Sequence, residues 1–486
     1  MGGASVPRVD SRTRTIRRES QTPTTQRFAA IQADPSWSFA ECSPRETGYI
    51  THCYHRYPAK FIPQVAARLI REHSGPGDVV LDPFMGSGTT LVEAMMAGRR
   101  ARGCDLNPAA LVASLAKTTP IPPERLHAAL REFQGRLAWL DEERRGPTLF
   151  PPPEPVLPPN QERLDWWFPR EQQRRLGTIL AIIEAEADPA IRGFLRCGFS
   201  HTLKTASYWL MKSSKPTRDK KKVAEGVPDP IRPLLRHLWK MQRANLVFWH
   251  ALPEKSRLKP HWAADVRQAD ARALPWKPRS AHLVVTSPPY VTSYEYAGLH
   301  ELTALWLGGL LVGGVSTRRD GSRDEDIPPT PTALTKESFS GSAAARTRAV
   351  GGMSSSREPP EAKSELGRQI VAELRLRSQS KAEEVRQYFL DMQHAFREMR
   401  RVLKPGGRVC NVIGNTALAG VAVLNAEVHA EILESLGFTL VDVVKRVIPL
   451  KTLPQVRDPR SGKFTSDKAT ATHAYPEEFI LIASRA

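Results

Sequence analysis

Two short stretches of the sequence place polar side chains directly after apolar runs. In "LDPFMGSGTT" (81–90), Asp82 follows an apolar segment, and Gly86 and Gly88 come shortly after it. In "HLVVTSPPY" (282–290), an apolar run meets two prolines, which lack the N–H donors that a strand interior needs. Both stretches therefore predict strand ends, and ligands of open α/β sheets bind at the carboxyl ends of strands.

The second stretch has the groups needed to methylate an amino group on a nucleobase. Such a nitrogen is a poor nucleophile because its lone pair is delocalised, so acceptors must hold its hydrogens and direct the lone pair. Ser287 offers a side-chain oxygen and Pro288 a backbone carbonyl, while Pro289 fixes φ. Tyr290 offers a flat face on which a base taken out of its helix could stack. Taken alone, the stretch is better explained as a stiffened strand end with a packed tyrosine.

The glycine stretch matches a nucleoside ligand better than a phosphate. A Walker loop needs Lys after its last glycine, and this chain has Thr89 there. A dinucleotide fingerprint needs a third glycine, and Leu91 occupies that position. S-adenosylmethionine, an adenosine without phosphate, remains. Asp105 ends the next apolar segment and could accept hydrogen bonds from ribose hydroxyls. Asp270, at the end of a third predicted strand, could accept one from the adenine amino group.

The composition favours a polyanionic partner. The chain has 486 residues, 41% of them hydrophobic, and a formal net charge of +19. We find no amphipathic helix with a long apolar face beside basic residues, so nucleic acid is favoured over a membrane surface. No apolar run approaches the ~20 residues of a membrane span. The five cysteines are scattered, which indicates a reducing cytoplasm without a disulfide frame.

The sequence does not fit two other functions, metal binding and methylation of cytosine at carbon 5. His52, Cys53 and His55 are close in sequence, but no fourth ligand with suitable spacing follows them, so no metal site is predicted. Methylation of cytosine at carbon 5 requires a thiolate, usually presented by Pro-Cys. None of the five cysteines follows a proline.

The order of elements predicts one α/β domain with two long insertions. The strand, turn, helix and strand of residues 79–105 form a β-α-β unit, which implies a parallel sheet. We expect four kinds of region: a disordered basic arm at 1–40, a catalytic domain at 50–115 and 262–486, a helical and basic insertion at 116–261 that is a candidate for target recognition, and a disordered loop at 316–365. Within the insertion, "KSSKPTRDKKK" (212–222) is either a solvated basic face or a phosphate contact. The basic segment 451–470 is a second candidate.

Together the two motifs resemble those of the S-adenosylmethionine-dependent DNA amino methyltransferases, the N4-cytosine/N6-adenine family. "HRYPAKF" (55–61) resembles the segment that precedes the cofactor motif in that family, and "YPEEFILIASR" (475–485) resembles its closing strand. The resemblance implies a class I (Rossmann-like) methyltransferase fold, α/β, with a seven-stranded, mostly parallel sheet whose last strand is antiparallel. The family's usual motif order for S-P-P-Y members is reversed here, because the cofactor motif comes first.

The resemblance also implies roles for particular residues. The expected catalytic residues are Ser287, Pro288, Pro289 and Tyr290. The expected cofactor-binding residues are Lys60, Phe61, Asp82, Phe84, Gly86, Gly88, Thr89, Asp105 and Asp270. A serine at the first catalytic position favours cytosine N4 as the target. Adenine N6 is the first alternative, an RNA base methyltransferase the second, and a non-catalytic nucleic-acid-binding protein the third.

The implied cofactor is S-adenosyl-L-methionine, with no metal. The implied partner is double-stranded DNA, with a cognate restriction endonuclease as an option and no membrane. Such a protein would work in the cytoplasm, in association with the nucleoid.

Overall fold

A computed structural model of the chain describes residues 23–57, 61–138, 153–213, 216–291, 296–312, 361–448, 456–457, 472–473 and 477–486. A seven-stranded sheet forms its centre. The strands are β1 (Val79–Asp82), β2 (Arg100–Asp105), β3 (Ala264–Gln268), β4 (Ala281–Thr286), β5 (Leu403–Ile413), β8 (Phe438–Val447) and β11 (Glu477–Arg485).

The sheet order is β3-β2-β1-β4-β5-β11-β8. Neighbouring strands from β3 to β5 pair in parallel, whereas β11 runs antiparallel to both β5 and β8. The strand order changes direction between β1 and β4, which creates the switch point where open sheets bind ligands. The predicted class I methyltransferase fold, with its antiparallel last strand, is confirmed.

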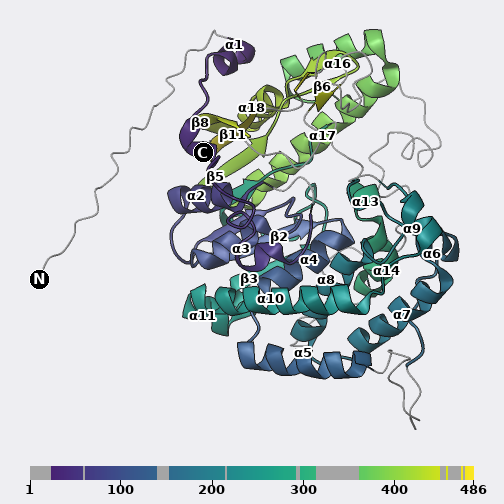
Figure 1. Ribbon diagram of the computed structural model, residues 1–486. Coiled ribbons are helices and arrows are strands. Elements are labelled where there is room, and N and C mark those ends of the chain that lie inside the picture. Colours follow the sequence, from purple (N-terminus) through teal and green to yellow (C-terminus); the bar gives the residue numbers. More distant parts are fainter. Residues whose placement is uncertain are drawn as a thin grey trace, which may run out of the picture.

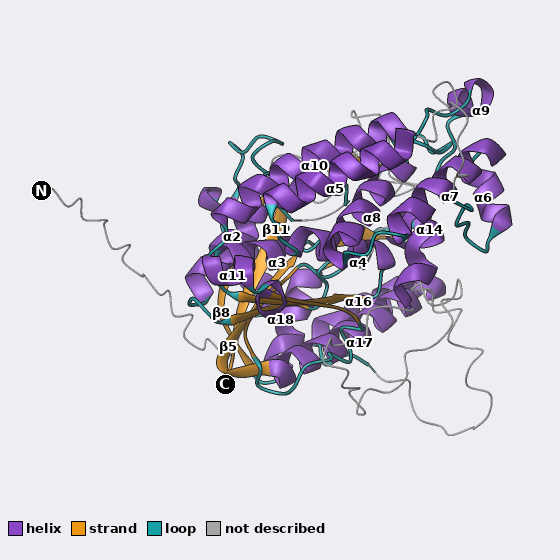
Figure 2. Cartoon of the chain, turned by 90° about the horizontal axis from the view of Figure 1, so that it is seen from below, coloured by secondary structure: helices purple, strands orange, loops and turns teal. Residues whose placement is uncertain are grey.

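Helices cover both faces of the sheet (Figures 1 and 2). Neighbouring residues of a strand face opposite sides, so Val80 and Leu81 of β1 belong to different buried clusters. The cluster of Val80 includes residues of α2 (Pro63–His73) and α3 (Thr89–Met96). The cluster of Leu81 includes residues of α16 (Glu365–Arg377), α17 (Gln379–Val402) and α18 (Asn425–Ser435).

A third buried cluster lies among helices beside the sheet. Its residues come mainly from α4 (Pro108–Thr118), α5 (Pro123–Ala138), α6 (Gln161–Trp167), α7 (Arg170–Glu184), α8 (Pro189–Leu203), α10 (Ile231–Ala251) and α14 (Glu301–Val312). Of these helices, α14 lies outside the predicted insertion 116–261, and α4 begins before it. The insertion therefore shares one core with a helix that begins before it and a helix that follows it.

The other described elements are short. They are α1 (Thr24–Ala29), η1 (Pro35–Trp37), η2 (Ile50–Cys53), α9 (Lys220–Glu225), α11 (Glu254–Leu258), α12 (Pro260–Ala263), α13 (Tyr296–Leu299), β6 (Thr416–Leu418), β7 (Val421–Val423), β9 (Val456–Arg457) and β10 (Thr472–His473).

The prediction of a disordered arm over 1–40 was wrong for residues 23–40. Phe28 and Trp37 are buried, and the Phe28 ring lies 5.4 Å from that of Phe479. The Asp34 amide also donates to the Lys445 carbonyl at 2.8 Å. These apolar contacts fix a segment whose own sequence is polar. Residues 1–22 lie outside the described part, as do 316–360 of the predicted loop, and α16 begins at Glu365.

Candidate cofactor and catalytic site

The glycine turn after β1 depends on backbone conformations that favour glycine. Gly86 has φ of 46° and Gly88 has φ of 75°, both in the left-handed region. A Cβ atom on Gly88 would lie 2.9 Å from the Ser114 hydroxyl oxygen, which in turn donates to the Gly86 carbonyl at 2.8 Å. The turn therefore packs tightly on α4, and Thr89 begins α3 directly after it.

Two buried hydroxyls in this turn have no hydrogen-bond partner within the described part of the chain. They belong to Ser87 and Thr89, which are 2% and 3% exposed. Buried polar atoms are normally satisfied, so an unsatisfied pair suggests a missing polar partner. This observation fits a turn that receives the polar groups of a cofactor such as S-adenosylmethionine.

Asp105 at the end of β2 is held against the same turn. One carboxylate oxygen accepts from the Gly86 amide at 3.0 Å, and the other accepts from the Asn107 amide at 2.9 Å. Burial raises the pKa of this carboxyl group above its ordinary value. Each carboxylate oxygen can accept a second hydrogen bond, so Asp105 keeps acceptor capacity for ribose hydroxyls.

Asp82 connects the cofactor turn to the catalytic stretch. Its carboxylate accepts from the Thr286 hydroxyl at 2.7 Å and from the Phe84 amide at 3.1 Å. Burial raises the pKa of Asp82 to about 6. The Thr90 hydroxyl adds a second link, donating to the Val285 carbonyl at 3.1 Å. The carboxyl ends of β1 and β4 are therefore joined by side chains as well as by backbone pairing.

The catalytic stretch follows β4 without helical or strand structure. Pro288 is buried, and Ser287, Pro289 and Tyr290 are half-buried. The Tyr290 hydroxyl donates to the Glu478 carboxylate at 3.3 Å, and Glu478 forms a buried ion pair with Arg446. This contact was not predicted, because no local pattern connects residue 290 with residue 478.

Gly414 packs closely against the ring of Tyr290. A Cβ atom on Gly414 would lie 3.0 Å from Cε2 of Tyr290. One side of the phenol ring is therefore covered by the backbone after β5, and Glu478 holds its hydroxyl end.

A stacked pair of aromatic rings covers the glycine turn. A Cβ atom on Gly86 would lie 3.1 Å from the Tyr57 ring, and Tyr57 stacks on His300 at 4.3 Å. Of the two predicted residues in this segment, Phe61 packs against the cluster that contains α2 and α3. Lys60 lies outside the described residues.

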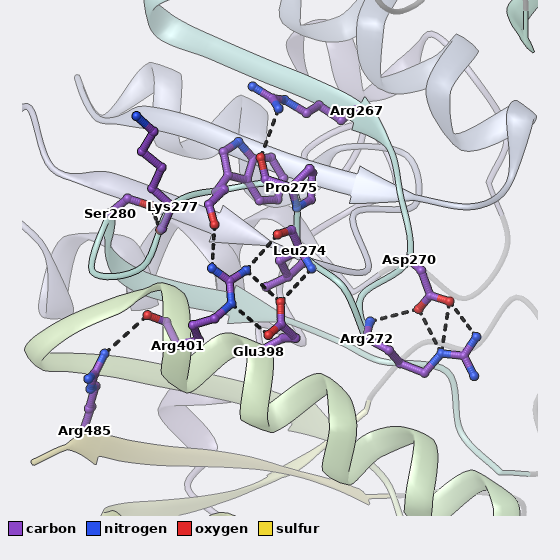
Figure 3. A network of polar contacts seen from close by, with 11 residues as sticks. Arg267, Asp270, Arg272, Leu274, Pro275, Lys277, Ser280, Glu398, Arg401 and Arg485 are labelled. Carbon is purple, nitrogen blue, oxygen red and sulfur yellow. Dashed lines mark hydrogen bonds and ion pairs between the residues drawn. The ribbon is translucent and has the colours of Figure 1, made fainter. Parts of the chain in front are cut away.

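Asp270 differs from the other predicted acids. It lies two residues after β3 ends, and its carboxylate pairs with Arg272 at 2.5 Å (Figure 3). Arg272 also pairs with Asp391 at 2.8 Å. Those carboxylates raise the pKa of Arg272 above its ordinary value. Asp270 is thus engaged by a cation, whereas Asp105 is engaged by backbone amides.

The histidines considered above as metal ligands, His52 and His55, each contact another side chain. The His52 ring contacts the Glu93 carboxylate at 2.7 Å, and the His55 ring contacts the Ser200 hydroxyl at 2.8 Å. Within the described ranges, no group of three or more His, Cys, Asp or Glu side chains could hold a metal ion. Among the helices of the same ranges, none is long and apolar enough to cross a membrane.

The fold and this arrangement of turn, acids and catalytic stretch define a class I S-adenosylmethionine-dependent methyltransferase. A sequence model of the N6/N4 DNA methylases matches residues 9–115. The Type II methyltransferase M.MvaI of Kocuria varians is 25% identical over 445 residues, covering 90% of this chain and 91% of that protein. The chain is therefore similar to the N4/N6 DNA methylases over residues 9–115 and to Type II methyltransferases over most of its length.

Two further similarities complete the comparison. The Type II methyltransferase M.BsoBI of Geobacillus stearothermophilus is 23% identical over 418 residues, covering 80% of this chain and 78% of that protein. A solved S-adenosylmethionine-dependent methyltransferase of Methanosarcina mazei is 9% identical, covers 86% of this chain and 96% of its own, and has a TM-score of 0.28.

Proposed function

We propose that this protein transfers a methyl group from S-adenosylmethionine to the exocyclic amino group of a DNA base, with cytosine N4 as the favoured target. The observation that carries the proposal is the Thr286–Asp82 hydrogen bond of 2.7 Å. It joins the end of the catalytic strand to the end of the cofactor strand. Parallel neighbours lie about 4.8 Å apart, so a cofactor on the glycine turn and a base at Ser287 would be adjacent.

Some residues of the site would bind the cofactor, and others would orient the amino group of the base. The bound cofactor supplies an electrophilic methyl group. Asp105 would bind the ribose, and the unsatisfied hydroxyls of Ser87 and Thr89 would bind polar groups of the cofactor's amino-acid end. Ser287 Oγ and the Pro288 carbonyl would accept the two amino hydrogens, which directs the nitrogen lone pair at the methyl group. The contribution is mainly one of orientation.

Tyr290 would stack on the extruded base. Its ring lies against the backbone of Gly414, and its hydroxyl donates to Glu478, so the ring is held in a fixed position. An aromatic platform suits a base that has left its helix. Asp270 stays a predicted contact for the adenine amino group, and its ion pair with Arg272 would have to leave one carboxylate oxygen available.

The choice between cytosine and adenine rests on Ser287. A serine in this position favours cytosine N4, and the names of M.MvaI and M.BsoBI do not state a base. Double-stranded DNA as substrate is supported by the DNA methylase family and by the excess of basic residues. A cognate restriction endonuclease and a cytoplasmic, nucleoid-associated location stay predictions.

The test uses methyl-labelled S-adenosylmethionine and unmodified genomic DNA, followed by mass spectrometry of the nucleosides. We expect N4-methylcytosine from the wild type and a loss of roughly a hundredfold in Ser287→Ala, because a preorganised hydrogen-bond partner is removed. Ser435→Ala, a helix-end serine whose hydroxyl donates to the Ile432 carbonyl, is the matched control and should retain activity.

Other products would change the proposal in defined ways. N6-methyladenine would keep the family chemistry and overturn the choice of base. Cofactor binding without any methylated DNA base would overturn the DNA substrate, and the same assay with RNA would then identify the alternative substrate.

A further inference from the structure

An arginine on the inserted region is held between two aromatic rings. The guanidinium carbon of Arg218 lies 4.6 Å from the ring centre of Trp166 and 5.0 Å from that of Tyr208. Trp166 is 48% exposed, which is unusual for so large an apolar side chain. A guanidinium stacked on aromatic faces can still donate hydrogen bonds to phosphate oxygens in its own plane. The Nε atom of Arg218 is buried and has no hydrogen-bond partner within the described residues.

This arginine lies beside the segment that follows the catalytic stretch. A Cβ atom on Gly298 of α13 would lie 3.3 Å from the Pro216 ring, two residues before Arg218. Arg163 of α6 donates to Glu301 of α14 at 2.7 Å, so the helix that carries Trp166 is fixed to the same segment. Figure 1 shows α6, α9 and α13 at the same end of the molecule.

The basic run 212–222 contains cations with different surroundings. Lys222 is enclosed, because its ammonium donates to the carbonyls of Lys204, Thr205, Ser207 and Trp209 at 2.8–3.2 Å. Lys221 pairs with Glu225 at 3.7 Å. Lys222 thus holds the surrounding loop in place, and both lysines already have partners, which makes them poor candidates for binding DNA.

Among the described residues of the run, Lys212, Arg218 and Lys220 remain available. Lys212 and Lys220 are exposed, and neither they nor Arg218 form an ion pair with a carboxylate within the described ranges. The nearby acids are engaged: Asp219 accepts from the Lys221 amide at 3.0 Å, and Asp165 pairs with Arg170 at 2.7 Å. A cluster of unneutralised cations around an exposed aromatic is the surface expected of a phosphate-backbone contact.

We propose that Lys212, Arg218 and Lys220 contact backbone phosphates of the substrate DNA close to the target base. The proposal rests on the proposed function, because it takes DNA as the substrate. Contacts of this kind position the duplex and carry no sequence information of their own. The surface would therefore set affinity and register, while base recognition would come from other residues.

The test replaces Lys212, Arg218 and Lys220 together by glutamine and measures affinity for duplex DNA by fluorescence anisotropy over a series of salt concentrations. Each phosphate contact contributes about 0.9 to the slope of log affinity against log salt concentration. We expect the slope to fall by about 1 for each cation removed, equally for target and non-target duplexes. The affinity for S-adenosylmethionine, measured separately, reports on folding.

The matched control removes the same charge elsewhere. Arg279, Lys363 and Arg397 are exposed and line one depression beside the amino end of β4, at the opposite edge of the sheet from Ser287. Their replacement by glutamine should leave the salt slope close to the wild-type value.

Equal slopes for the two triple variants would overturn the inference, because the loss would then reflect only net charge. An unchanged slope in the first variant would overturn it as well, provided that the wild type methylates DNA. Failure of the wild type to methylate DNA would instead overturn the proposed function. A single variant, Arg218→Gln, should lower the slope by about 1 if the triple variant proves unstable.

Discussion

At the scale of single residues, the tyrosine that we propose as a stacking platform is held by residues far along the chain. Tyr290 directly follows the second proline of the catalytic stretch, yet its hydroxyl contacts Glu478 of β11 at 3.3 Å. Glu478 is itself fixed by a buried ion pair with Arg446 of β8. A ring fixed at its hydroxyl end loses little freedom when a base stacks on it. The two antiparallel strands thus contribute to a site that the parallel strands define.

The first prediction separates the ring of Tyr290 from its hydroxyl. Tyr290→Phe keeps the stacking face and loses a hydrogen bond of about 1 kcal/mol, so we expect roughly a fivefold fall in kcat. Tyr290→Ala loses the platform, and stacking is worth about 1–3 kcal/mol per base, so we expect the larger fall in kcat/KM. Steady-state kinetics on duplex DNA measure both. Equal losses in the two variants would show that the hydroxyl has a role of its own.

At the scale of elements, the helical core contains a group of buried histidines. The rings of His201 and His237 stack at 3.7 Å, and His55 meets His201 edge-on at 5.8 Å. Burial lowers the pKa of His55 to about 3 and that of His237 to about 4, and it also lowers the pKa of His201. The three rings are therefore neutral in the folded protein at neutral pH. They join the segment that follows η2, and that also carries Tyr57, to α8 and α10.

The second prediction concerns acid stability. The unfolded histidines have pKa values near 6.5 and bind protons that the folded state excludes, so the free energy of unfolding falls as the pH falls below about 6.5. Between pH 7 and pH 5, each histidine should cost about 2 kcal/mol. Urea denaturation over this range measures the loss. Asp82, whose pKa is raised to about 6, acts in the opposite direction, because its protonated form is favoured by folding as the pH falls.

A variant isolates the contribution of the histidines. His237→Gln keeps a donor for the Tyr54 carbonyl, which the His237 ring contacts at 2.7 Å, and it cannot take up a proton. Its stability should fall less steeply with acid than that of the wild type, by about one proton in the slope. The same slope in both proteins would contradict the assignment of His237 as a buried neutral group.

At the scale of the whole molecule, the described part of the N-terminal segment joins the last strands of the sheet. Phe28 of α1 is 2% exposed, and its cluster includes residues of β1, β5, β11 and α18. Ala33 forms a bridge with Lys445 of β8. The described N-terminal residues therefore pack into the same core as the C-terminal strands.

The third prediction is that Phe28→Ala destabilises the folded protein. Loss of a buried phenylalanine costs about 3–5 kcal/mol through lost burial and the cavity that remains. Denaturant unfolding measures the change, and Leu376→Ala is the control, because Leu376 is 85% exposed and should change stability by less than about 0.5 kcal/mol. A loss below about 1 kcal/mol for Phe28→Ala would show that the segment detaches without affecting the core.

The sequence alone was enough to predict the strands, the glycine turn and the placement of Asp82 and Asp105 at strand ends. These features depend on local chemistry: the left-handed conformations of Gly86 and Gly88, the missing donors of Pro288 and Pro289, and the alternation of buried residues. The paired motifs also pointed to the family. Asp270 was placed near a strand end, but its ion pair with Arg272 was not anticipated.

Only the tertiary structure decided which distant residues complete the site. Glu478 on Tyr290, Tyr57 over Gly86, and Pro216 against α13 are contacts between segments far apart in the chain. The surroundings of Lys222 were also not predictable from sequence. In the sequence it is one of several basic residues, whereas in the folded protein its ammonium group is surrounded by carbonyls. The physical reason is that local pattern reports backbone conformation and which residues are apolar. The partner that each side chain contacts depends on how separate elements pack against one another. This packing is determined by all residues of the core together.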